Sequence, residues 1–546
     1  MDRFGLAWVV SDDLALALAE PPARAVGGAR KQPETTWSHQ PTRGSRMTPS
    51  KSSAVTGGFV KRLSRYGALL GTASAAEQAL RFVRNMILAR LIAPEAFGIV
   101  AIVLSVCALF QVLTGLGVKE AVIQHPRGGE RTYLNGAWWL ALARGALVYL
   151  IAFVTAPWFA TFYGVPELNL LLRIAFIHVL AQGAMSAGVF TAIKEMRYWR
   201  WVIVQQGGGV VGIIVAIVLA VRIDGPWALV IGYATEAVAR CIFSYLVCPF
   251  RPGLQFEHEH LRALWRFARG MFGLPILYLV FSEGSVFAMG KLCTKHELGL
   301  FAVSLTLARV PSMFANQMVD LLMPAFSQMQ GNVERVTQGL LKVTTPIAVI
   351  AFPVFFFTLL FGRGILTVVY GLPYADAADA LVILLANEIM VTCGIPLAGV
   401  YMAMGRPTLL RRFSLIRAIL MIVLLYPAII WLGLVGAALV PLISMSVAYV
   451  FQLLRMHTLI GLDLRAYIRV FVRGSVLASP AVVLWIVVAT NLRSHSPGTV
   501  IGVAGGAGVL FYLGILALFG RKTVVREYLW PFGKHVSFQT MADQKG

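Results

Sequence analysis

Charged side chains stand inside long apolar stretches of this sequence. The first such stretch carries Glu77, Arg81 and Arg84 near its middle, with Asn85 beside them. In a helix that advances about 100° per residue, the three charged side chains fall within about 60° of one another and share one stripe. A guanidinium group keeps its charge at any physiological pH and binds phosphate oxygens as a bidentate fork. A stripe of this kind could therefore bind a pyrophosphate head group.

Later apolar stretches carry further charges. They hold Arg144, then Glu236 and Arg240, then Glu283, then Arg309 with Asn316 and Asp320 on one helix face, and finally Asn387 and Glu388. A charge at the centre of a bilayer costs about 2.5–3.5 kcal/mol on insertion scales, so each needs a partner or a water-filled cavity.

Two interpretations of these charges stay open. Glu77–Arg81 and Glu236–Arg240 have the i,i+4 spacing that forms an ion pair within one helix. Arg84, Arg144 and Arg309 have no such partner, which favours a cavity. We expect the substrate-binding arginines to be Arg81, Arg84, Arg144, Arg240 and Arg309. The candidates for coupling or gating are Glu77, Glu236, Glu283, Asp320 and Glu388, and packing against arginine is the alternative role for these acids.

The composition is that of a membrane protein. Of 546 residues, 58% are hydrophobic and only 13% are charged, whereas soluble domains have about 25% charged residues. The formal charge of +22 lies mostly in short segments between apolar runs, which argues against a nucleic-acid-binding face. The five cysteines lack metal-ligand spacing and are expected to be small core residues: Cys107, Cys241, Cys248, Cys293 and Cys393. No metal, cofactor or catalytic residue is expected.

The apolar windows predict about fourteen transmembrane helices, since one crossing needs about 20 apolar residues. They lie near 68–92, 98–118, 135–156, 168–190, 202–222, 226–249, 268–291, 298–324, 342–361, 378–403, 410–431, 435–456, 472–490 and 499–519. Alternate loops are rich in Lys and Arg, at 61–65, 119–131, 194–200, 251–269, 406–412 and 455–473. By the positive-inside rule, these loops and both termini are cytosolic.

An internal repeat relates two parts of the chain. ARLIAPEAFGIVAIVLS (89–105) aligns without gaps to GKLCTKHELGLFAVSLT (290–306), which pairs Gly98 with Gly299 and Arg90 with Lys291. Six helices separate the two segments, so the repeats would enter the membrane in the same direction, related by a two-fold axis along the membrane normal. Chance similarity of two apolar stretches is the alternative.

The expected organisation follows. A six-helix lobe covers 61–250, a second covers 251–458, two additional helices cover 459–519, and a cytosolic tail covers 520–546. Residues 1–60 are rich in Pro, Ser, Arg and Gly and predict a disordered cytosolic segment. Residues 1–46 are either part of that segment or an upstream mis-start before Met47.

The stretch LRFVRNMILARLIAPEAFG (80–98), together with GLGVKEAVIQ (115–124), PAFSQMQ (324–330) and VVYGLPYADAADAL (368–381), resembles the polysaccharide transporter family of oligosaccharide flippases. That family belongs to the superfamily of multidrug extruders and the lipid II flippase. The resemblance implies two six-helix lobes, alternating access and a substrate of undecaprenyl-pyrophosphate-linked oligosaccharide in the bacterial inner membrane. It also implies membrane lipid, a polysaccharide polymerase and chain-length proteins as partners. FVRNMILAR further resembles the first-helix motif of the lipid II flippase, in which Arg84 matches a required arginine and Asn85 replaces an acid.

Two other functions remain as alternatives. A multidrug or cation antiporter would share the fold, but central arginines disfavour cationic substrates. A membrane polymerase or glycosyltransferase would usually need a large external loop or a carboxylate motif, neither of which we find. GGGVVG (207–212) lies within an apolar run instead of following a strand, and predicts close helix packing or a hinge, not a nucleotide site.

Overall fold

The computed structural model describes residues 78–114, 117–253, 274–312, 326–327, 329, 332–492 and 495–519. All belong to one compact unit within 75–546. The described residues contain helices and connecting turns but no strand, which confirms the expected all-α class. The predictions for 1–60 and 520–546, and those for Glu77, Asn316 and Asp320, lie outside the described residues.

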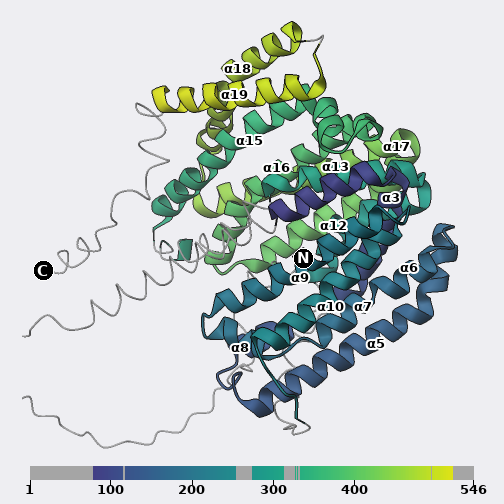
Figure 1. The fold of residues 1–546 in the computed structure, drawn as a ribbon. Coiled ribbons are helices and arrows are strands. Elements are labelled where there is room, and N and C mark those ends of the chain that lie inside the picture. Colours follow the sequence, from purple (N-terminus) through teal and green to yellow (C-terminus); the bar gives the residue numbers. More distant parts are fainter. Residues whose placement is uncertain are drawn as a thin grey trace, which may run out of the picture. The chain divides into compact units, whose positions relative to one another are not determined.

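Each of the fourteen predicted windows overlaps a described helix (Figure 1). The helices are 78–91, α3 (Pro94–Leu113), α4 (Val118–Gln124), α5 (Arg131–Tyr163), α6 (Leu168–Ala175), α7 (Ile177–Gly183), α8 (Gly188–Lys194), α9 (Tyr198–Ala220), α10 (Trp227–Val247), α12 (Leu274–Leu292), α13 (Lys295–Ala308), α15 (Val333–Val369), the 3-10 helix η2 (Leu372–Ala377), α16 (Ala378–Ala403), α17 (Pro407–Ile460), α18 (Leu464–Asn491) and α19 (Pro497–Phe519).

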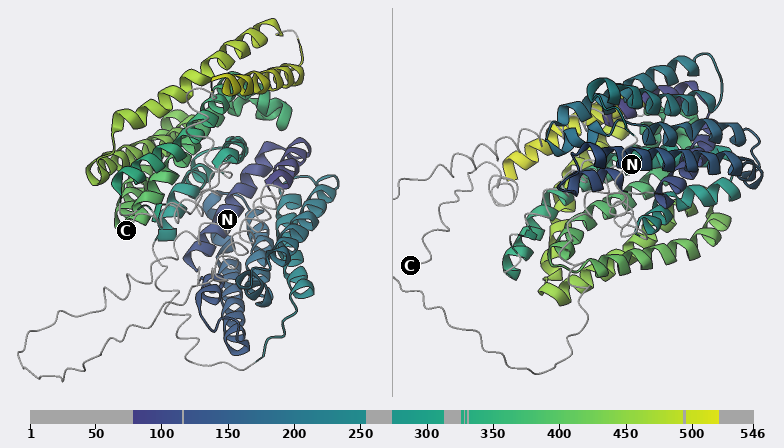
Figure 2. Two further views of the ribbon diagram at one scale, coloured as in Figure 1. Left: turned by 90° about the vertical axis from the view of Figure 1, so that its left-hand side faces the viewer. Right: turned by 90° about the horizontal axis from the view of Figure 1, so that it is seen from below.

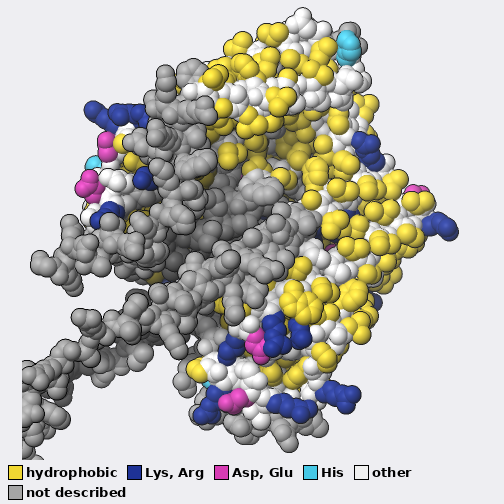
Figure 3. Space-filling view, turned by 60° about the vertical axis from the view of Figure 1, so that its left-hand side comes forward, with side chains coloured by type: hydrophobic (Ala, Val, Ile, Leu, Met, Phe, Trp, Pro, Cys, Tyr) yellow, Lys and Arg dark blue, Asp and Glu magenta, His cyan; other side chains and the backbone are white. Residues whose placement is uncertain are grey.

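Within these ranges, nine helices are long and apolar enough to cross a membrane, or ten if one bent pair counts as a single span. The chain is therefore a multi-pass membrane protein. The count of fourteen spans stays a prediction. Figure 3 shows the corresponding surface, where apolar side chains cover broad areas and Lys and Arg gather at the margins.

Two windows differ from simple straight helices. The windows 410–431 and 435–456 run together in the 54-residue α17, which breaks at Gly433 with φ 52° and ψ −127°, a conformation that a residue without Cβ adopts readily. The window 168–190 is split, with a bend of 59° between Leu168–Gly183 and Gly188–Lys194. At this bend Ser186 donates its amide to Ser244 Oγ and its hydroxyl to Cys248 O, so α10 and its C-cap satisfy the polar groups of the broken helix.

Helices pack side by side both with their neighbours in sequence and with helices far away in it. α9 packs along α10, α3 packs against both α12 and α13, and α16 packs along α17. The two helices α18 and α19 contact α15 and each other (Figures 1 and 2). The predicted pair of additional C-terminal helices thus packs as a layer on α15.

The contact between α3 and α13 depends on two glycines. A Cβ added at Gly98 would lie 2.2 Å from Lys295 O, and one added at Gly299 would lie 1.8 Å from Pro94 O. The sequence repeat aligns Gly98 with Gly299 and Pro94 with Lys295, so these are the same contact with the two segments exchanged. We call this pair of approaches the glycine contact.

Polar interactions around the glycine contact also involve residues that the sequence repeat aligns with each other. Glu95 Oε1 lies 2.7 Å from His296 Nδ1, and the repeat aligns these two residues with each other. Arg90 Nη2 donates to Val368 O, and its aligned residue Lys291 donates through Nζ to Phe162 O at 2.5 Å. These two carbonyls belong to the penultimate residues of α15 and α5.

Two hydrogen bonds each join a pair of loops that the charge pattern places on the same side. Tyr374 donates its hydroxyl to Ile92 O at 3.3 Å, which joins two loops poor in Lys and Arg next to the glycine contact. In the basic set, Lys194 donates to His125 O at 2.5 Å. These contacts agree with the alternation of loops that the charge pattern predicts.

We predict that Gly299→Ala destabilises the protein, because the new methyl group would overlap a backbone oxygen of α3 that no side-chain rotation can move. Overpacking of this kind costs about 1–3 kcal/mol. Thermal unfolding of the purified protein in nanodiscs should show a lower midpoint. Gly514→Ala on α19 is the control, because nothing lies within 4 Å of its Cβ position. Equal midpoints for the two variants would show that the glycine contact is not tight.

Candidate functional site

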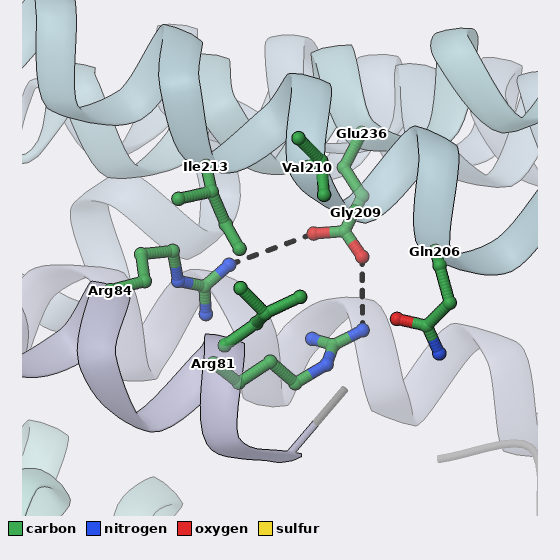
Figure 4. A pocket seen from close by; sticks show the side chains of 8 residues that line it. Arg81, Arg84, Gln206, Gly209, Val210, Ile213 and Glu236 are labelled. Atoms are coloured by element: carbon green, nitrogen blue, oxygen red, sulfur yellow. Dashed lines mark hydrogen bonds and ion pairs between the residues drawn. The ribbon is translucent and has the colours of Figure 1, made fainter. Parts of the chain in front are cut away.

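Three arginines from two helices meet around one carboxylate. Arg81 Nη2 lies 2.9 Å from Glu236 Oε1, Arg240 Nη2 lies 2.6 Å from the same oxygen, and Arg84 Nη1 lies 3.6 Å from Glu236 Oε2. Figure 4 shows Arg81 and Arg84 reaching from helix 78–91 towards the carboxylate on α10. We call Arg81, Arg84, Glu236 and Arg240 the Arg-rich cluster.

Glycines of α9 determine where the acidic member of this cluster stands. A Cβ at Gly208 would lie 2.3 Å from Arg240 Cγ, and one at Gly212 would lie 2.5 Å from Glu236 Cβ and 2.9 Å from Gly232 O. The i,i+4 spacing of small residues lets two helix backbones approach closely. This confirms the interpretation of GGGVVG as a packing motif, and it fixes α10 so that Glu236 faces helix 78–91.

A small hollow, partly open to solvent, adjoins the cluster. Its lining is Leu80, Arg81, Arg84, Gln206, Gly209, Val210, Ile213 and Glu236. Its cavity volume of about 10 Å³ is room for about one water molecule. A larger anion therefore requires the side chains that line the hollow to move apart.

Arginines outnumber acids in the Arg-rich cluster. Three guanidinium groups face the carboxylate of Glu236, which is only 4% exposed. A buried charge is costly unless a counter-charge or water compensates it. Glu236 is therefore a shared counter-charge for arginines of two helices.

A second group of charges lies on α12, α16 and α17 and at the C-terminal end of α13. Arg309 Nε lies 4.0 Å from Glu388 Oε1, and Arg309 Nη2 donates to Ser282 O at 3.2 Å. Glu283 acts electrostatically on Arg309, and Glu388 acts on both Arg309 and Arg417. We call Glu283, Arg309, Glu388 and Arg417 the neutral cluster, since its formal charges cancel.

The acidic members of the neutral cluster are buried. Glu283 accepts a hydrogen bond of 2.6 Å from Ser105 on α3, which links the predicted second lobe to the first. Glu388 is 8% exposed. The roles of these two residues in coupling or gating, and that of Glu236, stay predictions.

Arg144 stands apart from both clusters in its bonding. Its Nε and Nη2 donate to Thr114 Oγ1 at 3.2 and 3.1 Å, and Nη2 also donates to Gln111 O at 3.2 Å. These acceptors lie at the C-terminal end of α3, where unpaired carbonyls favour a cation. The expected meeting of Arg84, Arg144 and Arg309 in one cavity is not seen among the described residues, which give each arginine different polar partners.

The sequence interpretation missed three participants. Gln206 lines the pocket, Ser105 binds Glu283, and Arg417 belongs to the neutral cluster. Arg417 was detectable, because it stands seven residues inside the window 410–431. Gln206 and Ser105 carry no charge, and no spacing rule distinguishes them from other polar residues of a helix.

No group of three or more His, Cys, Asp or Glu suited to a metal ion occurs in the part of the chain that the structure describes. The five cysteines are free, and Cys107, Cys248 and Cys393 are buried as small core residues.

Comparison with known proteins gives consistent matches. Residues 87–379, more than half of the chain, match the family described as "Polysaccharide biosynthesis protein". The chain is 26% identical over 481 residues to the succinoglycan biosynthesis transport protein ExoT of Rhizobium meliloti, covering 82% of this chain and 91% of that protein. It is 22% identical over 357 residues to the lipopolysaccharide biosynthesis protein WzxC of Escherichia coli, covering 64% and 71%.

Among solved structures, the lipid II flippase MurJ in an inward closed conformation superposes with a TM-score of 0.69. The superposition covers 83% of this chain and 99% of that one at 12% sequence identity. At this identity the likeness establishes the fold alone.

We predict that Glu236→Gln, which keeps the side-chain volume, lowers the free energy of unfolding by about 3 kcal/mol, because three arginines lose their shared carboxylate. Thermal unfolding in nanodiscs measures this change. Inorganic pyrophosphate should raise the midpoint of the variant more than that of the unmodified protein, since the anion replaces the missing charge. The exposed Glu334→Gln on α15 is the control. An unchanged midpoint for Glu236→Gln would contradict the role of this carboxylate.

Proposed function

The chain belongs to the polysaccharide biosynthesis protein family, and on this basis we propose that it translocates undecaprenyl-pyrophosphate-linked oligosaccharides across the bacterial cytoplasmic membrane. The observation that carries the proposal is the Arg-rich cluster, in which three arginines of two helices meet at one carboxylate inside an otherwise apolar helix bundle. ExoT is named a transport protein and WzxC a lipopolysaccharide biosynthesis protein, which supports the same class of substrate.

The Arg-rich cluster suits the pyrophosphate of such a substrate. Arg81 and Arg84 approach from one helix and leave part of their guanidinium groups exposed, with side-chain exposures of 34% and 19%. Planar guanidinium groups bind phosphate oxygens in bidentate fashion, and such bonds are stronger than bonds between neutral groups. Glu236 orients the arginines while the site is empty. The bound anion places further negative charge beside the three arginines.

Alternating access is the mechanism we propose. A carrier with one central site must open to each side in turn, so contacts at one end must break when that end opens. The glycine contact and its polar surroundings are suited to this role, because they join the two predicted lobes at one end. Their exchange symmetry supports a two-fold relation between the lobes.

The orientation follows from the loop charges. The glycine contact lies among loops poor in Lys and Arg, so we assign it to the extracytoplasmic side, with the basic loops and both termini cytosolic. While the glycine contact is closed, the substrate would enter from the cytosolic side. Separation of α3 from α13 would then release it outward.

The alternatives receive less support. A multidrug or cation antiporter of the same fold does not explain three arginines around one carboxylate. A polymerase or glycosyltransferase is disfavoured because the chain covers 91% of a relative named as a transport protein. We propose that polymerase and chain-length proteins act on the translocated product, as separate partners.

We predict that Arg84→Ala abolishes export, because it removes the less exposed of the two arginines that helix 78–91 contributes to the Arg-rich cluster. A strain lacking the gene, complemented with this variant, should accumulate lipid-linked saccharide on the cytosolic leaflet. The measurement is leaflet-specific labelling of extracted lipid-linked saccharide, with immunoblotting to confirm equal protein. Arg363→Ala is the control, since Arg363 is exposed and pairs with exposed Asp376. Normal export by Arg84→Ala would refute the assignment.

We predict that covalent linkage across the glycine contact stops transport. Glu95→Cys and His296→Cys together, in a background without the five native cysteines, should react with a short cleavable thiol cross-linker and lose export. Reduction of the linker should restore it. Glu334→Cys with Gln338→Cys, both on α15, controls for cross-linking within one helix. Full export by the linked protein would exclude separation of α3 and α13.

A further inference from the structure

The neutral cluster differs from the Arg-rich cluster in charge balance. It combines Arg309 and Arg417 with Glu283 and Glu388, so its formal charge is zero. A phosphate group would gain the attraction of two arginines and lose as much to two carboxylates. Pyrophosphate therefore has no electrostatic reason to bind at the neutral cluster.

The sequence repeat shows where the two clusters diverge. Its alignment, extended without gaps along helix 78–91 and α12, places Ser282 opposite Arg81 and Ser285 opposite Arg84. The second helix of this pair thus has hydroxyl groups where the first has guanidinium groups. The arginines that suit pyrophosphate on the first helix have no counterpart on α12.

Aromatic side chains adjoin the neutral cluster. The guanidinium of Arg417 lies over the ring of Phe281, 4.4 Å from its centroid, and Tyr278 packs edge-to-face on Phe281 with ring centroids 5.4 Å apart. Tyr278, Phe281 and Arg417 are each partly exposed. The described residues offer no hydrogen-bond partner to Arg417 Nε.

This set of groups matches the chemistry of a sugar. Hydroxyl groups both donate and accept hydrogen bonds, so they need carboxylates and guanidinium groups together. The C–H faces of a pyranose ring are apolar with a partial positive charge and suit the negative face of an aromatic ring. A neutral polyhydroxylated ligand satisfies both requirements, whereas an anion satisfies neither.

We propose that the neutral cluster binds the saccharide of the lipid-linked substrate, while the Arg-rich cluster binds its pyrophosphate. This inference rests on the proposed function. It assigns the two ends of one substrate to the two halves of the chain. Glu388, Arg417 and Arg309 then supply hydrogen bonds to hydroxyl groups, with Phe281 and Tyr278 as the apolar surface.

The experiment compares two probes on the purified full-length protein in nanodiscs. One probe is undecaprenyl pyrophosphate, and the other is the lipid-linked saccharide extracted from the strain that lacks the gene. The double variant Arg309→Met with Glu388→Gln removes a positive and a negative charge together, so the formal charge of the cluster stays at zero. Arg417→Met is the second variant. Thermal unfolding checks that both are folded.

We expect each of these variants to bind the saccharide-bearing lipid about tenfold more weakly, the loss expected for one or two hydrogen bonds to charged groups. Their affinity for undecaprenyl pyrophosphate should stay within about twofold of the unmodified protein. Arg84→Ala should weaken the binding of both probes by the same factor.

If the neutral-cluster variants lost affinity for both probes equally, or for neither, the assignment of the saccharide would be overturned and the proposed function would still stand. Failure of the unmodified protein to bind either probe would instead refute the proposed function. Where Arg417→Met does not fold, the double variant decides between these outcomes.

Discussion

The carboxylate of Glu236 is the interaction on which the first half of the molecule depends. It alone, among the described ionisable groups, contacts arginines from its own helix and from helix 78–91 at distances of 2.6–3.6 Å. Without it, helix 78–91 would bring two guanidinium groups into an apolar bundle with no counter-charge. With it, those guanidinium groups share a counter-charge and insertion of that helix becomes tolerable. The same arrangement carries the anion binding that we propose.

Close approach of helix backbones gives these charges their geometry. Gly208 and Gly212 bring α9 against α10 and hold Glu236 at a fixed depth, while Gly98 and Gly299 bring α3 against α13. Helices in a membrane gain little from apolar burial against one another, so packing at short distance has to supply much of the association. In the first pair the two glycines are one turn apart on α9. In the second, each helix contributes one glycine, close to its first residue.

The sequence predicted the elements better than the partners. Apolar windows located a helix at each expected span, because hydropathy over about 20 residues averages out local irregularity. They could not show that Gly433 breaks a continuous helix. Nor could they show that α10 and its C-cap supply the hydrogen-bond partners of Ser186 at the bend. Among the site residues, the stripe of Arg81 and Arg84 followed from helical periodicity. Its carboxylate partner did not, since the i,i+4 rule pairs residues of one helix and Glu236 lies 152 positions or more away in sequence from either arginine.

The two halves of the chain share a scaffold but differ in chemistry. Residues that the repeat aligns still meet each other at the glycine contact, where Gly98 and Gly299 make reciprocal approaches. On the helices that precede these, two arginines of helix 78–91 correspond to two serines of α12. A symmetric substrate would favour equal clusters in both halves. A long amphiphilic substrate, with an anionic group near one end of its polar part and neutral sugars beyond it, presents different chemistry to each half. Divergence of the clusters, with conservation of the geometry where the halves meet, is the arrangement that such a substrate requires.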